Sequence, residues 1–398
     1  MSVKGKVYLC GQEFLNEEYG YTNNMRSSLL YGYVFLSLLG VSCGQRQSDP
    51  YAGAALLYTP EYAKGFLLKE VGNNRILQSE SFTYILYPRS DSLQNRGKLN
   101  HIPYPITHAV CLSTTHVAYL ETIGKSKVIT GVSGAQYLSN AAIREAVVQG
   151  NVLDVGYEGT LNYEKVLSLH PDVVFAYAIP GASDAYLKPL IQMGVPVIYL
   201  SDFLEVHPLG KAEYMVAFSA LFDFPVFEDA VSTFRTICTE YFHLTTYVTD
   251  IAFTPKILMN APFKDVWYFP GGKNYLSTLI SDAGGVVLGS KEGVIESQPV
   301  SLEQAYLYAL EADIWLHPNA CRTLHDLAES ELRFAQIPAF KSQSVYNNTL
   351  RSTVGGGSDF WERGVTEPHI ILADLIKIFH PQLLPEHEFV YYERLANK

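Results

Sequence analysis

The sequence predicts an α/β protein of two Rossmann-like lobes with parallel sheets, joined by a single long α-helix. Three features favour this class: apolar strands without polar alternation, helices interleaved between them, and one strand-free helical stretch near the middle of the chain. Strands read as continuous apolar runs when helices cover both faces of a parallel sheet. At 398 residues the chain is also too long for one ordinary domain.

The first lobe is predicted from the order of strands and helices up to residue 201. Three short segments, 63–71, 74–81 and 82–89, alternate apolar and polar residues, which is typical of antiparallel strands with one solvated face. Continuous apolar strands then alternate with helices. These strands are expected at 108–113, 128–133, 172–178 and 196–201.

The middle of the chain is helical, and the α/β alternation resumes from residue 256. Apolar residues recur there at spacings of three and four, with no strand between the two helical segments. We therefore divide the chain into an N-terminal extension with a lipoprotein signal (1–43), a first lobe with its preceding strands (44–204), connecting helices (205–246) and a second lobe (247–398).

The segment after Met25 has the layout of a secretory signal. Arg26 supplies a positive charge, an apolar run covers residues 29–39, and small residues precede Cys43. The letters LGVSC resemble a bacterial lipobox, in which the Cys thiol carries a diacylglycerol, although Gly40 stands where Leu is usual. We expect a periplasmic, membrane-anchored lipoprotein with lipid at Cys43; the alternative is a cleaved soluble signal with an incidental Cys.

Charge and cysteine content argue against several classes. A net charge of −11 disfavours a nucleic-acid surface, which needs clustered Lys and Arg to neutralise phosphates. Besides Cys10 and Cys43, the thiols of Cys111, Cys238 and Cys321 show no CxxC spacing, so we expect no disulfide and no structural zinc. The glycine-rich stretches lack the order of a phosphate-binding loop, and no GxSxG motif is present.

One unit occurs twice in the chain. Glu164 lies near the start of a short amphipathic helix, and Asp172 opens the apolar strand that follows. Glu303 and Asp313 repeat this order in the second lobe. The repetition indicates two lobes with similar internal order.

These segments together resemble the substrate-binding proteins of ATP-binding-cassette importers for iron–siderophore, haem and cobalamin compounds. The resemblance covers roughly residues 105–381 and implies the class III periplasmic-binding-protein fold, which has a helical backbone between its lobes. It rests on the order of several motifs, including a segment similar to Bacteroidetes lipoproteins of this kind. The motifs are NYEKVLSLHPDVV (162–174), WYFPGGKNYLSTLISDAGG (267–285), VSLEQ (300–304) and FWERGVTEPHIILADLI (360–376).

The resemblance implies a docking role for Glu164 and Glu303. In the family, one Glu at the top of each lobe pairs with Arg pockets on the two permease subunits, and these two residues occupy the matching positions. A pair of carboxylates, one on each lobe, suits a two-fold symmetric membrane partner. The alternative is that each Glu only complements its helix dipole, an effect of about 0.3–1 kcal/mol.

The ligand is expected between the lobes, at loops that follow the carboxyl ends of the parallel strands. Aromatic faces and isolated cations on these loops suit a large planar or macrocyclic ligand with carboxylate or catecholate groups. The ligand-binding candidates are Thr115, His116, Tyr137, Tyr157, Tyr177, Trp267, Tyr268, Lys273, Asn319, Arg322, Trp361 and Arg363.

We expect a binding protein with no catalytic residues and no cofactor, whose ligand is a metal chelate such as a ferric siderophore, haem or cobalamin. His116, His317 and Tyr137 could ligate iron, but no HxxxH or HExxH pair occurs, so no protein metal site is assigned. The expected partners are an ABC permease dimer and the membrane, with no nucleic acid, and the protein is expected to be a monomer. The alternative is a surface lipoprotein enzyme that acts on a tetrapyrrole or metal complex with a related two-lobed fold.

Overall fold

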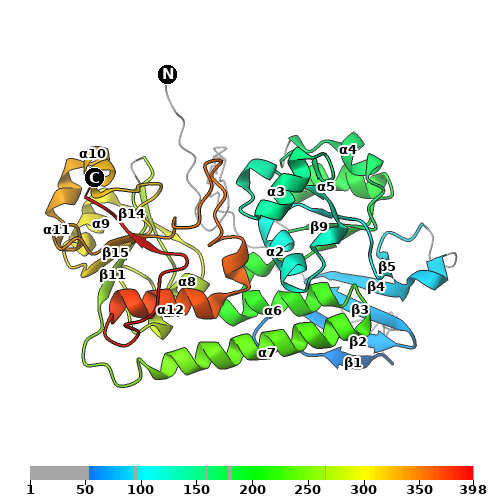
Figure 1. Cartoon of the computed structure of the whole chain (residues 1–398), viewed down its shortest axis with the longest axis horizontal. Helices are drawn as coiled ribbons and strands as arrows, with labels where there is room; N and C mark the ends of the chain where they lie inside the picture. Colours follow the sequence, from blue (N-terminus) through cyan, green and yellow to red (C-terminus); the bar gives the residue numbers. More distant parts are fainter. Residues whose placement is uncertain (1–52, 93–96, 158–159, 178–181, 265, 398) are drawn as a thin grey trace, which may run out of the picture. The chain divides into compact units, whose positions relative to one another are not determined.

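The computed structural model describes residues 53–92, 97–157, 160–177, 182–264 and 266–397. The predicted signal segment and the lipidation candidate Cys43 lie outside the described residues. Residues from Ala55 onward form one compact unit. Figure 1 shows its elements coloured along the chain.

The unit begins with a five-stranded sheet in the order β1-β2-β3-β4-β5. Its strands pair antiparallel, except that β4 and β5 are parallel. The predicted antiparallel pairing is thereby confirmed, with an edge strand on either side, but β3 and β4 bury consecutive residues and so lack the expected solvated face. The strands are β1 (Ala55–Tyr58), β2 (Phe66–Val71), β3 (Asn74–Ser79), β4 (Phe82–Pro88) and β5 (His101–Tyr104).

The first lobe is built on a parallel sheet in the order β10-β9-β6-β7-β8. Its central strands β6 and β9 are completely buried, which explains their uninterrupted apolar sequences. The strands are β6 (Ala109–Cys111), β7 (Ile129–Val132), β8 (Leu153–Asp154), β9 (Val173–Ala176) and β10 (Val197–Tyr199). The helices are α2 (Thr114–Thr122), α3 (Ala141–Val148), α4 (Tyr163–Ser168) and α5 (Ala182–Gln192).

Two helices follow the first lobe, α6 (Pro208–Ser219) and α7 (Phe224–Thr246). They pack against each other, and Figure 1 shows both in green. Every residue of α6 is buried, whereas α7 buries only one stripe that includes Phe234 and Tyr241. Beyond its first turn α7 contains neither Pro nor Gly, so the helix has no sequence cause for a kink.

The second lobe has a sheet in the order β13-β11-β15-β16-β17, parallel except for the pairing of β17 with β16. A separate antiparallel pair joins β12 to β14. The strands are β11 (Lys256–Met259), β12 (Val266–Phe269), β13 (Val286–Val287), β14 (Gln298–Ser301), β15 (Ile314–Leu316), β16 (Val345–Asn347) and β17 (Glu393–Arg394). The helices are α8 (Tyr275–Asp282), α9 (Leu302–Ala309), α10 (Leu324–Ser330), α11 (Pro338–Lys341) and α12 (Pro368–Phe379).

The N-terminal sheet is tied by two buried carboxylates, Glu213 on α6 and Glu205 in the segment just before α6. Glu213 accepts a hydrogen bond of 2.6 Å from the Tyr58 hydroxyl and three more from the backbone N–H groups of residues 61–63. Glu205 accepts hydrogen bonds from the N–H groups of residues 64 and 65. Because buried carboxylates are stable only when hydrogen-bonded or paired, these contacts fix the path of the chain between β1 and β2.

Candidate functional site

The loops that follow the first-lobe strands bring together two of the predicted tyrosines. Tyr137 follows β7 and Tyr157 follows β8; their half-buried rings lie 5.6 Å apart. Gly134 adopts a left-handed backbone with φ 62°, and a Cβ there would lie 3.0 Å from the Tyr137 ring and 3.1 Å from the Tyr157 ring. A side chain at this position would crowd both rings and strain the left-handed backbone, so glycine suits it.

The Asp154 carboxylate holds both tyrosine loops in place. It accepts hydrogen bonds from the N–H groups of Gly134, Ala135 and Gly156, at 3.2, 3.0 and 2.9 Å. Asp154 ends β8, so one side chain at the carboxyl end of the sheet positions the loops on two neighbouring strands. A site that must present aromatic rings needs this kind of rigid support.

Two further first-lobe candidates, Thr115 and Tyr177, follow β6 and β9. Thr115 lies in the first turn of α2 and is half-buried; its hydroxyl lies 3.4 Å from the Asp202 carboxylate. Tyr177 follows β9 and is half-buried, with its ring 6.1 Å from that of Phe203. Both side chains therefore lie at the predicted edge of the sheet.

In the second lobe, Trp361 is the centre of an aromatic group. Its half-buried ring lies 6.4 Å from Tyr275, the first residue of α8, and 6.2 Å from His317, which follows β15. His317 is buried and lies 2.8 Å from the Tyr392 hydroxyl. Burial lowers the pKa of His317 to about 3, so its imidazole is neutral at physiological pH.

The structure corrects two of the ligand-binding assignments. His116 is fully buried between the rings of Phe175 and Phe218, and burial lowers its pKa to about 4. Trp267 is 1% exposed, and its indole N–H donates to the Met259 carbonyl at 2.9 Å. Both side chains point into the core of their own lobe because the surrounding apolar rings exclude them from the surface.

The polar candidates of the second lobe differ in their exposure and in whether their side chains already form hydrogen bonds. Lys273 is exposed, and exposed Arg322 donates to the Ser352 hydroxyl at 3.2 Å. The half-buried Asn319 donates its amide to the Pro262 carbonyl at 3.2 Å.

Two further candidates of this lobe are also already engaged. Arg363 forms an ion pair of 2.7 Å with Glu367, so its guanidinium already has a partner. The half-buried Tyr268 lies on β12; only its backbone carbonyl, which accepts a hydrogen bond from the Asn260 side chain, is engaged in this way.

A buried charged pair where α6 meets the second lobe was missed from the sequence. The Lys211 ammonium lies 3.7 Å from the Asp202 carboxylate and 4.6 Å from the centre of the Tyr275 ring. Tyr275 begins α8, so this contact joins the connecting helix to the second lobe. The signal in the sequence is the pair of charges at 211 and 213 within the otherwise apolar run from Leu209 to Phe222.

The repeated Glu and Asp occupy equivalent places in the two lobes. Glu164 and Glu303 are exposed, and each is the second residue of its helix, after the N-caps Asn162 and Ser301. They therefore have the same position relative to the start of α4 and of α9.

The two aspartates also perform the same task. Asp172 accepts a hydrogen bond from the His108 N–H at 3.1 Å, just before β6. Asp313 accepts one from the Lys256 N–H at 2.8 Å, at the start of β11. Each carboxylate thus holds the beginning of the neighbouring parallel strand, so the Asp of the repeated unit has a structural role.

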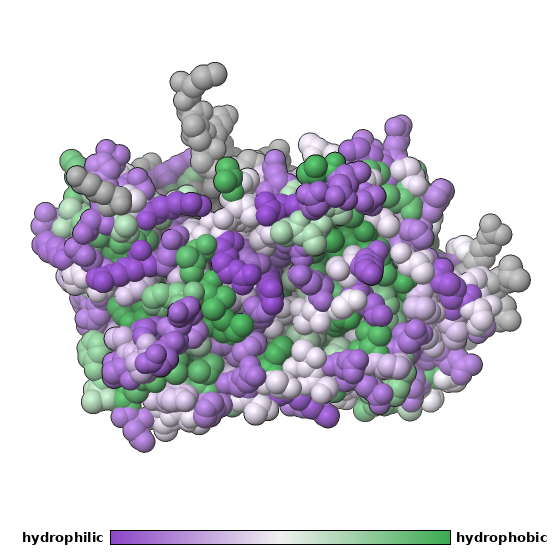
Figure 2. All heavy atoms as spheres, in the orientation of Figure 1, coloured by the Kyte–Doolittle hydropathy of each residue, from purple (hydrophilic) through white to green (hydrophobic). Residues whose placement is uncertain are grey.

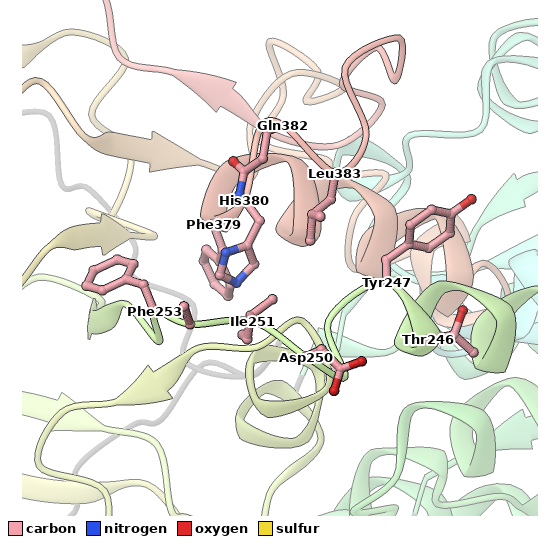
Figure 3. A pocket seen from close by; sticks show the side chains of 10 residues that line it. Thr246, Tyr247, Asp250, Ile251, Phe253, Phe379, His380, Gln382 and Leu383 are labelled. Atoms are coloured by element: carbon pink, nitrogen blue, oxygen red, sulfur yellow. The ribbon is translucent and has the colours of Figure 1, made fainter.

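The described chain also has two cavities, one of them away from the predicted ligand-binding residues and the other lined by Asn319 and Trp267 among others. One of about 550 Å³ lies where α7 and α12 end, and Figure 3 shows Tyr247, Phe253, Phe379 and His380 around it. The other, of about 320 Å³, lies within the second lobe and includes Asn319 among its lining residues. The first contains none of the predicted ligand-binding residues.

Among the residues that the structure describes, no group of three or more His, Cys, Asp or Glu side chains could hold a metal ion. The described helices also include none that is long and apolar enough to cross a membrane. Figure 2 shows hydrophilic and hydrophobic residues interspersed over the viewed face.

Comparison with known proteins confirms the predicted resemblance. Residues 109–184 match the model of the periplasmic binding protein family. An uncharacterized lipoprotein of Methanocaldococcus jannaschii is 23% identical over 295 residues, which cover 71% of this chain and 67% of the relative.

Solved structures show the same fold. A periplasmic binding protein from Veillonella parvula has a TM-score of 0.54 and 13% identity, covering 80% of this chain and 98% of that chain. The periplasmic haem-binding protein of Vibrio cholerae has a TM-score of 0.52 and 15% identity, covering 67% of this chain and 97% of that chain. The matched structures are binding proteins and not enzymes, and haem is a ligand of the second one.

Replacing Lys211 tests the buried pair. Lys211→Met should lower the free energy of unfolding by about 3–5 kcal/mol, because it leaves the buried Asp202 carboxylate without its cation. The double variant Lys211→Met with Asp202→Asn should recover part of this loss in urea unfolding. Lys256→Met, which breaks an exposed ion pair with Glu311, is the control and should change stability little. Additive effects of the two substitutions would contradict the pairing.

Proposed function

We propose that this chain, which has the two-lobed fold of the periplasmic binding proteins, is the extracytoplasmic substrate-binding component of an ABC importer. It captures a metal-chelate compound between its lobes and delivers it to a permease. The observation that carries the proposal is the pair of parallel-sheet lobes whose strand-end loops present aromatic side chains, Tyr137 and Tyr157 from one lobe and Trp361 from the other.

The chemistry of these loops supports a large ligand with a flat or ring-shaped face. Aromatic rings bind such faces over a broad area, while cations such as Lys273 and Arg322 would meet acidic groups at the ligand's edge. The ligand class that we propose is a ferric siderophore, haem or cobalamin, carried as cargo and not as a cofactor. The structural likeness to a haem-binding protein supports this class.

The ligand class is tested by titrating the purified protein with haem, cobalamin and ferric catecholate and hydroxamate complexes. One of them should raise the melting temperature saturably and quench tryptophan fluorescence, because Trp361 would contact it. Trp361→Leu and Tyr137→Leu should each weaken that binding about 5- to 150-fold, as expected for about 1–3 kcal/mol of lost contact.

The matched control for this titration is Tyr104→Leu, a half-buried tyrosine of β5 in the N-terminal sheet, outside the proposed site. It should bind the same compound with unchanged affinity. Turnover of any of these compounds, with no saturable binding, would contradict the proposal.

We further propose that Glu164 and Glu303 dock the two lobes onto the two subunits of the permease. Both carboxylates are exposed and each begins a short helix, so an arginine pocket on a partner could reach them. The equivalent positions in the two lobes suit a partner with two-fold symmetry. The protein would act as a monomer, with one lobe on each permease subunit.

Uptake measurements test this docking. In cells that express the permease, Glu164→Ala and Glu303→Ala should each reduce ligand uptake at least tenfold, while ligand affinity in solution stays unchanged. Glu386→Ala, an exposed glutamate elsewhere in the second lobe, is the control. Normal uptake in both variants would show that these carboxylates only complement their helix dipoles.

We also propose that Cys43 carries a lipid that anchors the protein in the membrane near its permease. The support is the lipobox-like sequence before Cys43 and the similarity to an uncharacterized lipoprotein. Cells fed a labelled fatty acid should label the native protein, and Cys43→Ser should abolish the label, with Cys321→Ser as the control. Equal labelling of native protein and Cys43→Ser would exclude this anchor.

A further inference from the structure

A loop of the second lobe reaches across to the first lobe and binds the start of α3. The loop, residues 351–364, connects β16 to α12. Its Glu362 carboxylate accepts hydrogen bonds from the N–H groups of Ser139 and Asn140, at 2.7 and 2.9 Å. Its Asp359 carboxylate accepts a third, of 2.9 Å, from the Ser139 hydroxyl. Asn140 is the N-cap of α3, so two carboxylates of one lobe hold the positive end of a helix of the other.

The same loop makes a close backbone contact that requires glycine. A Cβ on Gly355 would lie 2.5 Å from the carbonyl oxygen of Gln136, and one on Gly357 would lie 2.6 Å from the carbonyl oxygens of Tyr137 and Leu138. The glycines therefore let the loop approach the first lobe beside the Tyr137 ring. Thr122 and Thr366 add a hydrogen bond of 3.0 Å between the lobes.

The carboxylates in this contact are buried among few opposite charges. Glu362 is 1% exposed and Asp359 is 7% exposed. Arg351, on the same loop, lies 3.0 Å from the Asp359 carboxylate. In the first lobe, the Glu121 carboxylate accepts a hydrogen bond from the Asn140 side chain. On the loop, the Arg363 guanidinium is paired with the Glu367 carboxylate. Asp359 is thus the charged neighbour that acts on Glu362, and it carries the same sign.

We propose that loop 351–364 is a latch between the two lobes, in which Glu362 and Asp359 hold the start of α3, and that protonation of Glu362 strengthens the latch. This inference goes beyond the proposed transport function and does not depend on the identity of the ligand. Its consequence is that the lobes separate more readily, and the ligand site opens, as the pH rises.

The direction of the pH effect follows from burial. Burial of the carboxyl group raises the pKa of Glu362 to about 7 when the lobes are joined. The hydrogen bonds from Ser139 and Asn140 act in the opposite direction, and the nearby Asp359 carboxylate raises the pKa further. In separated lobes the group meets water, and its pKa returns towards the ordinary value of 4.5. The joined state therefore binds the proton more tightly. The extra stabilisation is complete below about pH 4.5 and is lost as the pH rises through about 7.

Hydrogen–deuterium exchange of the ligand-free full chain tests the latch. The protection factors of the Ser139 and Asn140 amides, corrected for intrinsic exchange, should fall at least tenfold between pH 5 and pH 8. Glu362→Gln, which has the shape of the protonated acid and does not titrate in this range, should make the protection independent of pH. Glu386→Gln, an exposed glutamate, should behave like the native protein. Native protection that is constant with pH, or a pH dependence that survives in Glu362→Gln, would overturn the proposal.

A steric variant tests the same contact without changing a charge. Gly357→Ala should push the loop away from the first lobe and lower the protection of both amides at every pH. Gly53→Ala is the matched control because a Cβ there meets nothing within 4 Å. Native protection in Gly357→Ala would refute the latch, whereas the ligand and uptake experiments would be unaffected by that result.

Discussion

The complete burial of α6 is the constraint on which the rest of this structure depends. The helix packs against α2 of the first lobe, α8 and α12 of the second lobe, α7, and strand β2 of the N-terminal sheet. A helix surrounded on all sides must be apolar, and its few polar groups need partners. Glu213 finds them in the backbone of residues 61–63, and Lys211 lies near Asp202 and Tyr275. The two charged residues of α6 therefore lie where other parts of the molecule contact it: Glu213 at the N-terminal segment and Lys211 at the second lobe.

The two lobes use the same devices at corresponding places. Asp172 and Asp313 hold the start of a neighbouring parallel strand, which helps to set the register of each sheet. Asp154 has a similar role at the carboxyl ends of the first-lobe strands, where it positions the loops that carry Tyr137 and Tyr157. Short carboxylate side chains that accept backbone N–H groups thus position both the sheets and the proposed ligand site.

The proposed ligand site and the inter-lobe latch share one region. Gly355 and Gly357 contact the backbone beside Tyr137, while Trp361 lies on the same loop as Glu362. Ligand binding at the aromatic residues would therefore affect the contact between the lobes. Since α7 has no break in its sequence, opening would arise from small displacements at this loop and not from a kink in the connecting helix.

Periodicity and composition were sufficient to predict the two parallel-sheet lobes, the connecting helices, the antiparallel N-terminal strands and the paired positions of Glu164 and Glu303. These features follow from local patterns: continuous apolar runs mark strands covered on both faces, and capping residues mark helix starts. The sequence also predicted that Tyr137, Tyr157 and Trp361 lie at the ends of strands, because loop order follows strand order.

Only the tertiary structure decided which of the loop residues are buried. His116 and Trp267 have the same local surroundings in the sequence as their exposed neighbours, yet each points into the core of its own lobe. The pairing of Lys211 with Asp202 and the hold of Glu362 on Ser139 likewise join residues 9 and 223 positions apart. Local periodicity carries no information on such contacts, because the direction of a side chain on a loop depends on what the other lobe places beside it.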